Sequence, residues 1–434
     1  MIKKLFIIPL VTYPLLAISL PKLIEIGVQK SSQIQKSRLD IEYAKAQSEQ
    51  GKAEQLGSID LVASYTKFNQ PRTLAPLTPV IMKDPVTAGS VATTKDLFGT
   101  GVSYSVPLFT GFAHTKQIEM DSIAIEMATL KSSLAKEQII YNIRSLYLSI
   151  LSTKELYIAQ KKYINSLTKL KEQIALEVNL GRKARIDLLK AQSNLQSNIS
   201  SLESIKANIT ILKASLSSLV GIDSIDELKS IKVEPKKPQI SSGEILKDSE
   251  SLNRIRVTNL NLKKSQKAID KSKSTNLPQV SLNSYYGYNY GVNDSSNPNS
   301  GDFADEKNWQ VSLNAKWTMY DFGKGDASTQ KAKIGYMKSK LDSQQTALDL
   351  QKLSKEAVAN IQKYYATYVS NKKQLKLAKE SESIETTRYY SDASTLNDLL
   401  YAKSQTSLAK AKLIDSRYKY QIGKYYIDYL QERN

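Results

Sequence analysis

The sequence contains no cysteine and only one histidine, His114, among its 434 residues. Disulfide bonds, thiol chemistry and an acylated amino-terminal cysteine are therefore excluded. His114 alone does not make a metal site, and no carboxylate cluster offers it obvious partners. No nucleophile–base pair is recognisable, and the segment 323–325 (Gly-Lys-Gly) lacks the rest of a phosphate-binding loop. These absences argue against an enzyme and against a cofactor.

Acidic residues are scarce relative to basic ones, 42 against 61, which gives a net charge of +19. Such an excess favours nucleic acid, an anionic membrane surface or an acidic substrate as a partner. The start of the chain argues against nucleic acid. A basic stretch, an apolar run from Leu5 to Leu16 and a small-x-small pattern at Ala17–Ser19 predict a secretory signal peptide over residues 1–19, cut after about Ser19.

Long apolar runs are also absent after this signal, since none approaches the roughly 20 residues of a membrane-spanning helix. An exported chain of this kind is expected to be soluble, surface-bound or a β-barrel.

From Ala113 to Val178 the chain has neither proline nor glycine. Roughly 66 residues at about 1.5 Å each predict a helical rod about 100 Å long. Its apolar stripe is narrow, which is typical of a coiled-coil seam.

Strict alternation of apolar and polar residues begins at Trp309 and continues beyond Trp317. This pattern suits a strand with one face in lipid and one in water, although for a single strand a half-buried soluble sheet is an equal alternative. Four such strands occur, and each pair precedes a long helix. The residues expected to face lipid are Ile59, Leu61, Val102, Tyr104, Leu282, Tyr286, Trp309, Val311, Leu313 and Trp317.

The order of elements recurs with a period of about 210 residues, which indicates an internal duplication. The first repeat, 20–225, is expected to hold a helix, a β-hairpin at 57–112, a long helix at 113–178 and a helix at 186–220. A linker at 226–242 follows. The second repeat, 243–434, is expected to hold a helix at about 243–274, a β-hairpin at 277–325, a long helix at 326–388 and a helix at 396–430, with turn-rich loops at 69–96 and 292–308.

Four strands cannot close a membrane barrel, because about eight is the smallest number that does. Three chains would supply twelve. The predicted fold is therefore an α+β membrane protein: a trimeric twelve-stranded outer-membrane β-barrel, four strands per chain, continued by a long periplasmic α-helical coiled-coil barrel.

Several short motifs, taken in order, resemble those of the TolC-family outer-membrane efflux proteins over essentially the whole mature sequence. They are Val106–Gly111, its counterpart Thr318–Gly323, Leu277–Val280, Leu180-Gly181 followed by Asp187–Gln192, Asp398–Leu400 with Ala402, and Arg417–Tyr420. The resemblance implies a homotrimeric channel in the cell outer membrane with a periplasmic helical domain. It also implies a periplasmic adaptor and an inner-membrane pump of RND or ABC type as partners, in efflux or type I secretion.

In that family the tunnel narrows at the helix tips of the second repeat, where carboxylates ring the aperture. Here Asp398 matches the first of these carboxylates, Tyr401 replaces a second, and Ser394 stands where the best-known member has a gating arginine. The resemblance thus implies an aperture formed by Asp398, Tyr401, Tyr389 and Ser394, with a thinner carboxylate ring. Asp398 also suits a second interpretation, in which it only complements a helix N-terminus.

The corresponding tip of the first repeat is basic. An adaptor-docking or anion-attracting collar is expected at Gly181, Arg182, Lys183, Arg185 and Asp187. A short basic run is also typical of a solvated helix end. For the whole chain the alternative function is an exported periplasmic coiled-coil scaffold without channel activity. The transported substrate does not follow from the sequence, because in such systems the pump selects it.

Overall fold

The computed structural model describes residues 17–295 and 300–433, so that most of the expected signal peptide (residues 1–16) lies outside the described residues. No helix in these ranges is long and apolar enough to cross a membrane. The elements of the first half are α1 (Leu20–Lys30), α2 (Ser32–Ala53), the 3-10 turn η1 (Glu54–Leu56), β1 (Ser58–Thr73), α3 (Pro79–Lys83), α4 (Pro85–Ser90), β2 (Thr93–Phe109), α5 (Ala113–Asn179) and α6 (Arg185–Val220).

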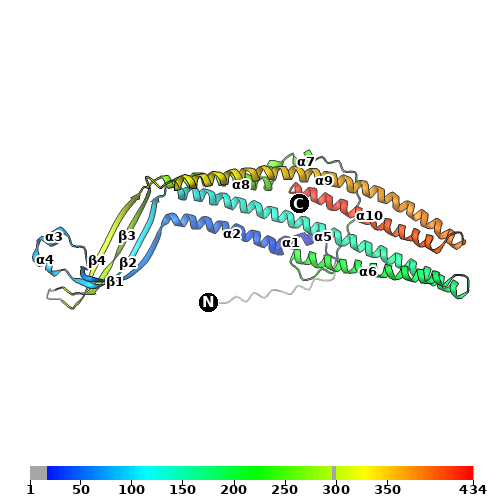
Figure 1. Ribbon diagram of the computed structural model, residues 1–434, viewed down its shortest axis with the longest axis horizontal. Helices are drawn as coiled ribbons and strands as arrows, with labels where there is room; N and C mark the ends of the chain where they lie inside the picture. Colours follow the sequence, from blue (N-terminus) through cyan, green and yellow to red (C-terminus); the bar gives the residue numbers. More distant parts are fainter. Residues whose placement is uncertain (1–16, 296–299, 434) are drawn as a thin grey trace. The chain divides into compact units, whose positions relative to one another are not determined.

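The second half repeats much of this order (Figure 1). Its elements are α7 (Ser242–Leu246), η2 (Ser249–Ser251), α8 (Asn253–Ser272), η3 (Lys273–Asn276), β3 (Gln279–Val292), β4 (Phe303–Lys316), α9 (Lys324–Tyr390) and α10 (Leu396–Leu430). In both halves two strands precede a helix of 67 residues, and a helix of 36 or 35 residues follows it.

The single helix expected at 243–274 is wrong, because the structure divides this segment into α7, η2 and α8. The interruption lies in the polar run 247–251. There the Ser251 hydroxyl donates to the backbone oxygen of Asp248 over 2.7 Å. Short polar side chains compete in this way with the hydrogen bonds of a helix. The first helix is likewise divided, between α1 and α2 at Ser31.

The loops between the paired strands are shorter than expected. Strand β4 begins at Phe303, which pairs with Val292, so the loop expected at 292–308 is largely wrong. Residues 303–308 alternate without an apolar face, so that periodicity gives no signal there. β4 also ends at Lys316, and Trp317 follows the strand. Within the loop expected at 69–96, β1 continues to Thr73, and α3 and α4 fold beyond it.

Two compact units compose the chain, and each takes segments from both halves. The first unit comprises Met1–Asp40, Thr129–Val257 and Gln344–Asn434, and the second comprises Ile41–Ala128 and Thr258–Ser343. The long helices α5 and α9 each contribute to both units.

The second unit contains the sheet, whose four strands run antiparallel in the order β1-β2-β3-β4 (Figure 1). β1 and β4 are its edges and have no further strand partner within the described residues. Unpaired edges of this length are a template for pairing with another chain.

The first unit is held by buried contacts between helices. Its main core joins α1, α5, α6 and α10, and the fully buried side chains at its centre include Leu23, Ile143, Tyr147, Leu216 and Val220. Complete burial of each such aliphatic side chain stabilises the fold by about 1.5–3 kcal/mol. A second cluster joins α7, α9 and α10 around Ile361, Tyr420 and Leu430.

Candidate functional site

One face of the sheet is apolar and exposed across all four strands. The register places Leu61 opposite Val102, Val102 opposite Tyr286, and Tyr286 opposite Trp309. Because paired residues point to the same side of a sheet, these four form one row. Leu61 is 82% exposed and Trp309 is 66% exposed. Such large apolar side chains at the surface require an apolar environment outside the single chain.

Neighbouring rows include the other residues expected on this face. Ile59 pairs with Tyr104, and Leu282 pairs with Leu313. Tyr104 also pairs with Ser284, and Ser284 pairs with Val311, so Val311 belongs to the same row as Ile59 and Tyr104. The structure therefore brings nine of the ten predicted residues onto one face. The tenth, Trp317, lies beyond the end of β4, where it is exposed and its indole N–H donates to the backbone oxygen of Asn276 over 3.2 Å.

The opposite face of the sheet is polar and small. One row across it consists of Asp60, Ser103, Tyr285 and Gln310. In the next row Gly101 pairs with Gly287, and a Cβ atom added to either glycine would lie within 2.8 Å of the Tyr285 ring or hydroxyl. The aromatic ring of Tyr285 thus covers the two glycines. Alternation of an apolar and a polar face is the pattern of a sheet between lipid and water.

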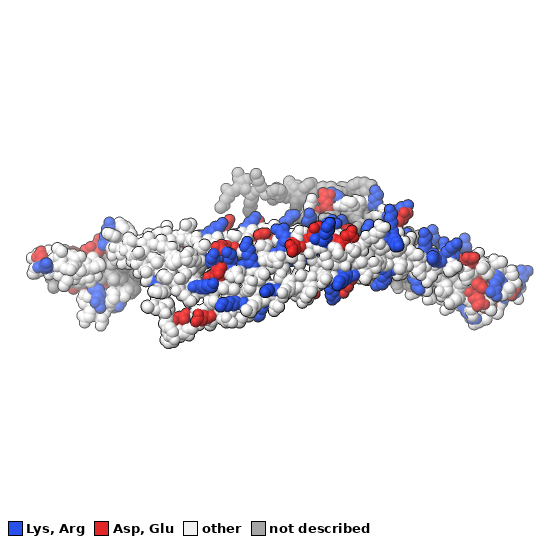
Figure 2. All heavy atoms as spheres, turned by 90° about the horizontal axis from the view of Figure 1, so that it is seen from above, with Lys and Arg blue, Asp and Glu red and all other residues white. Residues whose placement is uncertain are grey.

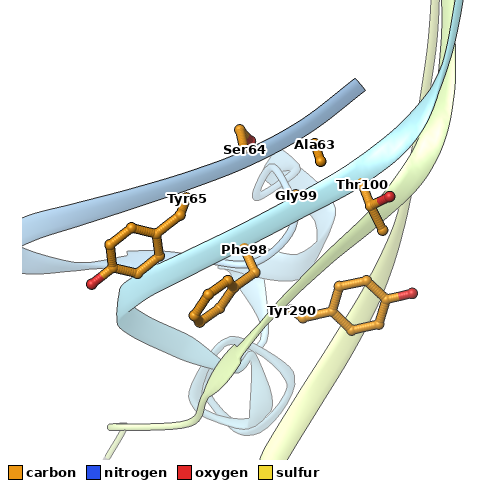
Figure 3. Close-up of a pocket in the computed structure, with 7 residues that line it drawn as sticks. All are labelled: Ala63, Ser64, Tyr65, Phe98, Gly99, Thr100 and Tyr290. Atoms are coloured by element: carbon orange, nitrogen blue, oxygen red, sulfur yellow. The ribbon is translucent and has the colours of Figure 1, made fainter. Parts of the chain in front are cut away.

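A shallow aromatic hollow lies on the apolar face, in the middle part of β1 and in the first half of β2. Figure 3 shows the rings of Tyr65, Phe98 and Tyr290 on the same side of three adjacent strands, with Ala63 and Thr100 beside them. The hollow has a volume of about 410 Å³. On the face shown in Figure 2 the strands carry few charged side chains, whereas Lys and Arg gather over the helices.

The second tip, residues 389–398, connects α9 to α10 in the first unit. Its helix start is a capping box: the backbone N–H of Thr395 donates to a carboxylate oxygen of Asp398 over 3.1 Å, and the backbone N–H of Asp398 donates to the Thr395 hydroxyl over 3.3 Å. The Thr395 hydroxyl also donates to the Asp398 carboxylate over 2.7 Å. The hydrogen bond from Thr395 lowers the pKa of Asp398. Asp398 therefore caps α10, as the second interpretation of the sequence holds, while its side chain remains exposed.

Tyr389 and Ser394 of the second tip, and Tyr401 just beyond it on α10, occupy different environments. Tyr389 is buried among Leu396, Leu399 and Leu400, and burial raises its pKa. Its hydroxyl has no hydrogen-bond partner among the described residues. Tyr401 is 68% exposed on α10. Ser394 is half-buried. Only Asp398 and Tyr401 of the four expected aperture residues thus present an exposed side chain.

The first tip, residues 180–187, has the same backbone geometry as the second. Gly181 has a φ of 72°, and the N–H of Arg182 donates to the oxygen of Glu177. In the second tip Asp392 has a φ of 55°, and the N–H of Ala393 donates to the oxygen of Arg388. Asp392 therefore stands where the first tip has glycine, in the left-handed conformation that aspartate tolerates better than most residues. By the same offset Asp187 corresponds to Asp398.

A lysine of the first tip contacts the second tip. The ammonium group of Lys183 lies 2.9 Å from a carboxylate oxygen of Asp392 and 4.7 Å from the centre of the Tyr389 ring. The hydrogen bond to Asp392 raises the pKa of Lys183. Arg182 and Arg185 are exposed. Asp392 was not among the residues singled out from the sequence, although its position opposite a glycine marks it as unusual.

No group of three or more His, Asp or Glu side chains suited to a metal ion occurs in the described part of the chain. His114 lies at the start of α5, where its backbone N–H donates to the Thr110 hydroxyl.

A family model described as "Outer membrane efflux protein" matches residues 23–222 and 250–424. No match is found among the curated proteins.

Solved structures with the same fold cover nearly the whole chain. A membrane protein from Pseudomonas aeruginosa has a TM-score of 0.80 at 14% sequence identity, over 96% of this chain and 91% of that one. The Campylobacter jejuni CmeC outer membrane channel has a TM-score of 0.78 at 17% identity, over 95% and 85%. The Vibrio cholerae outer membrane protein VceC has a TM-score of 0.75 at 16% identity, over 95% and 96%. At such identities the likeness shows the fold.

Proposed function

The chain belongs to the outer membrane efflux protein family, whose members are channels and not enzymes, and we propose that it is the outer-membrane channel of a tripartite efflux or type I secretion system. In this role it is a passive conduit from an inner-membrane pump and a periplasmic adaptor to the cell exterior. The observation that carries the proposal is the exposed row of Leu61, Val102, Tyr286 and Trp309 across all four strands.

The unpaired edges β1 and β4 support a trimer. A backbone N–H or C=O without a partner in hydrocarbon costs several kcal/mol, so an open sheet is not viable in a membrane. Pairing β4 of one chain with β1 of the next satisfies both edges. Two chains would give only eight strands, which leave no room for an aqueous path, whereas three chains give twelve. The apolar face then contacts lipid and the polar face of Asp60 and Gln310 lines water.

The two tips are the proposed aperture and docking surfaces. Asp398 of the second tip and Tyr401 just beyond it on α10 are exposed, and three copies of them around an axis would form the narrowest ring. The exposed Arg182 and Arg185 of the first tip would form a basic collar for the adaptor. The ion pair between Lys183 and Asp392, the tip ion pair, joins these surfaces within one chain, so that an opening motion that separates the two tips would stretch or break it.

The test combines solubility with conductance. Purified protein should require detergent, should cross-link to three chains and no further, and should form ion-conducting pores in a planar lipid bilayer. An exported coiled-coil scaffold would stay soluble without detergent and would not conduct. Cross-linking that stops at two chains would contradict the twelve-stranded barrel.

A further inference from the structure

The segment between β4 and α9 is unusually apolar for an exposed connection. Trp317 is 60% exposed, Met319 83%, Tyr320 74% and Phe322 89%. The rings of Tyr320 and Phe322 contact each other edge to face at 4.8 Å between centroids. Asp321 lies within this cluster, but its carboxylate is engaged by the backbone. It accepts hydrogen bonds from the N–H groups of Gly323 and Gly325 at 3.1 and 2.6 Å. We call residues 317–324 the β4–α9 junction.

The backbone of the junction is strained at its most exposed aromatic residue. Phe322 has a φ of 57°, in the left-handed region that is unfavourable for a non-glycine residue. The corresponding turn between β2 and α5 repeats this feature, since Phe112 has a φ of 68° and is 57% exposed. A strained residue persists where its surroundings hold it. The hydrogen bonds of Asp321 hold the turn at Phe322, and the Phe112 ring contacts the Phe109 ring edge to face at 5.2 Å between centroids. The Phe322 ring nevertheless stays 89% exposed, so most of its surface is available to a contact outside the single chain.

Lysines follow the junction directly. Residues 324–341 of α9 contain five lysines and one aspartate, and the five lysines are exposed. Lys324, Lys331 and Lys338 are seven residues apart and therefore share one face of the helix. Lys331 lies about 10 Å and Lys338 about 21 Å along the helix from Lys324. Helical side chains lean toward the N-terminus, so a long lysine reaches back toward the junction.

We propose that the β4–α9 junction binds the headgroup of an anionic glycerophospholipid in the periplasmic leaflet, with Trp317, Tyr320 and Phe322 among the glycerol and upper acyl groups and with Lys324 and Lys331 on the phosphate. This inference rests on the proposed function, because it requires the sheet to span the membrane. Two observations select a lipid as the occupant. The apolar face of β4, which includes Trp309 and Leu313, is exposed, and the equally apolar and exposed Trp317 follows directly after the last residue of the strand. The lysines complement a phosphate, and each adds about 1 kcal/mol at an anionic surface.

The headgroup layer is about 5–7 Å thick, which limits how many lysines take part. Lys324 lies within it, and Lys331 reaches it by its extended side chain. Lys338 shares their face but lies too far along α9. It is therefore a matched control.

The experiment measures lipid retention by native mass spectrometry. Delipidated protein in detergent is titrated with phosphatidylglycerol and, separately, with phosphatidylcholine. The wild type should prefer phosphatidylglycerol. Lys324→Gln and Lys331→Gln should each weaken phosphatidylglycerol binding about fivefold and leave phosphatidylcholine binding unchanged. Lys338→Gln should match the wild type. Equal losses for all three lysines would indicate unspecific charge attraction, and no loss for Lys324→Gln and Lys331→Gln would overturn the phosphate contact.

Phe322→Asn separates a lipid contact from a contact between chains. Asparagine tolerates the left-handed conformation, so the turn is retained and the ring is lost. Binding of both lipids should fall, while the melting temperature of the trimer in lipid-free detergent should be unchanged or higher. A lower melting temperature with unchanged lipid binding would assign Phe322 to the interface between chains and overturn the proposal. Failure of trimer formation or conductance in the wild type would instead contradict the proposed function.

Discussion

Lys183 and Asp392 form an ion pair between two helix tips that are 209 residues apart in the sequence. The pair is possible because Asp392 occupies the left-handed position that Gly181 occupies in the first tip. That conformation lets the chain turn directly from α9 toward α10, and the carboxylate meets the ammonium group of Lys183 at 2.9 Å. Lys183 in turn lies over the ring of the buried Tyr389. A lysine–aspartate pair and a cation–π contact thus connect the tips where the sequence has no arginine at position 394.

Neutralising the tip ion pair should favour the open channel. Asp392→Asn keeps a residue that tolerates a positive φ but removes the charge. Because Asp392 is 83% exposed, the pair is worth at most about 1 kcal/mol, and the open fraction should rise by about fivefold or less. Single-channel recording in planar bilayers measures it, and the effect should shrink at high salt.

Two further variants control this measurement. Lys183→Gln should have at least the effect of Asp392→Asn, because it also removes the cation–π contact with Tyr389. The double variant should add nothing to Lys183→Gln, since that change already breaks the ion pair. Lys206→Gln breaks an exposed ion pair with Glu203 inside α6, away from the tips, and should leave opening unchanged. If Asp392→Asn also behaves like the wild type, the tips are held by other contacts.

The two faces of β4 should differ sharply in tolerance of charge. Leu313→Arg places a guanidinium on the exposed apolar face and should cost about 2–4 kcal/mol near the middle of the membrane. Asn314→Arg, on the polar face, should assemble normally. Gel mobility of unheated trimers reports the assembled fraction. Equal defects from both changes would contradict the barrel.

Tyr389→Phe should leave conductance unchanged. The Tyr389 hydroxyl is buried without a hydrogen-bond partner in the described residues, and such a group costs about 1–3 kcal/mol. Its removal should therefore keep or raise the melting temperature measured by circular dichroism. A large loss of stability would show that the hydroxyl gains a hydrogen-bond partner in the assembled trimer. Tyr389 would then again be a candidate aperture residue.

Period-2 alternation predicts the strands well where one face is apolar, as around Val311 and Leu313. It fails at 303–308, because Asp305 and Lys307 occupy the same face as the aromatic residues and remove the contrast. The absence of proline and glycine predicts α5 closely. Neither signal reveals the tip ion pair, since Lys183 and Asp392 meet through the packing of two helix pairs. The capping of α10 by Asp398, in contrast, follows from the local sequence Thr-x-x-Asp.

Acid should loosen the first turn of α10. The Thr395 hydroxyl holds the pKa of Asp398 below its unfolded value of 3.8. The stabilisation is therefore complete above pH 3.8 and is lost as the pH falls through the lower folded value. Hydrogen–deuterium exchange followed from about pH 6 to well below pH 3.8, corrected for intrinsic rates, should show protection lost at residues 396–399.

The first turn of α6 is the internal control for this acid effect. Its N-cap, Ala184, makes no side-chain cap hydrogen bond. Thr395→Val should remove the acid effect from α10. An unchanged pH dependence in that variant would locate the sensitive group elsewhere.

Asp398 should set the ion selectivity of the channel. Its carboxylate remains exposed although it caps α10, so the cap leaves the charge available for the proposed aperture role. If three second tips surround the channel axis, three carboxylates share a narrow neck, where like charges attract cations and raise one another's pKa. That effect opposes the lowering by Thr395. The local ring should outweigh the net charge of +19, because solvated charges beyond about 10 Å are screened. Tyr401, 68% exposed one turn further along, adds bulk at the same neck.

Asp398→Asn should therefore lower cation selectivity, measured as the reversal potential under a salt gradient, without loss of trimers. Asparagine remains a good residue for the first turn, so the helix should persist. Asp187→Asn is the matched control, because Asp187 has the same position in the first tip, where we expect an outer layer. A selectivity change with Asp187→Asn alone would indicate that the first tip, and not the second, forms the aperture. If neither variant changes the reversal potential, Asp398 is a helix cap only and the narrowest ring of the channel is formed by other residues.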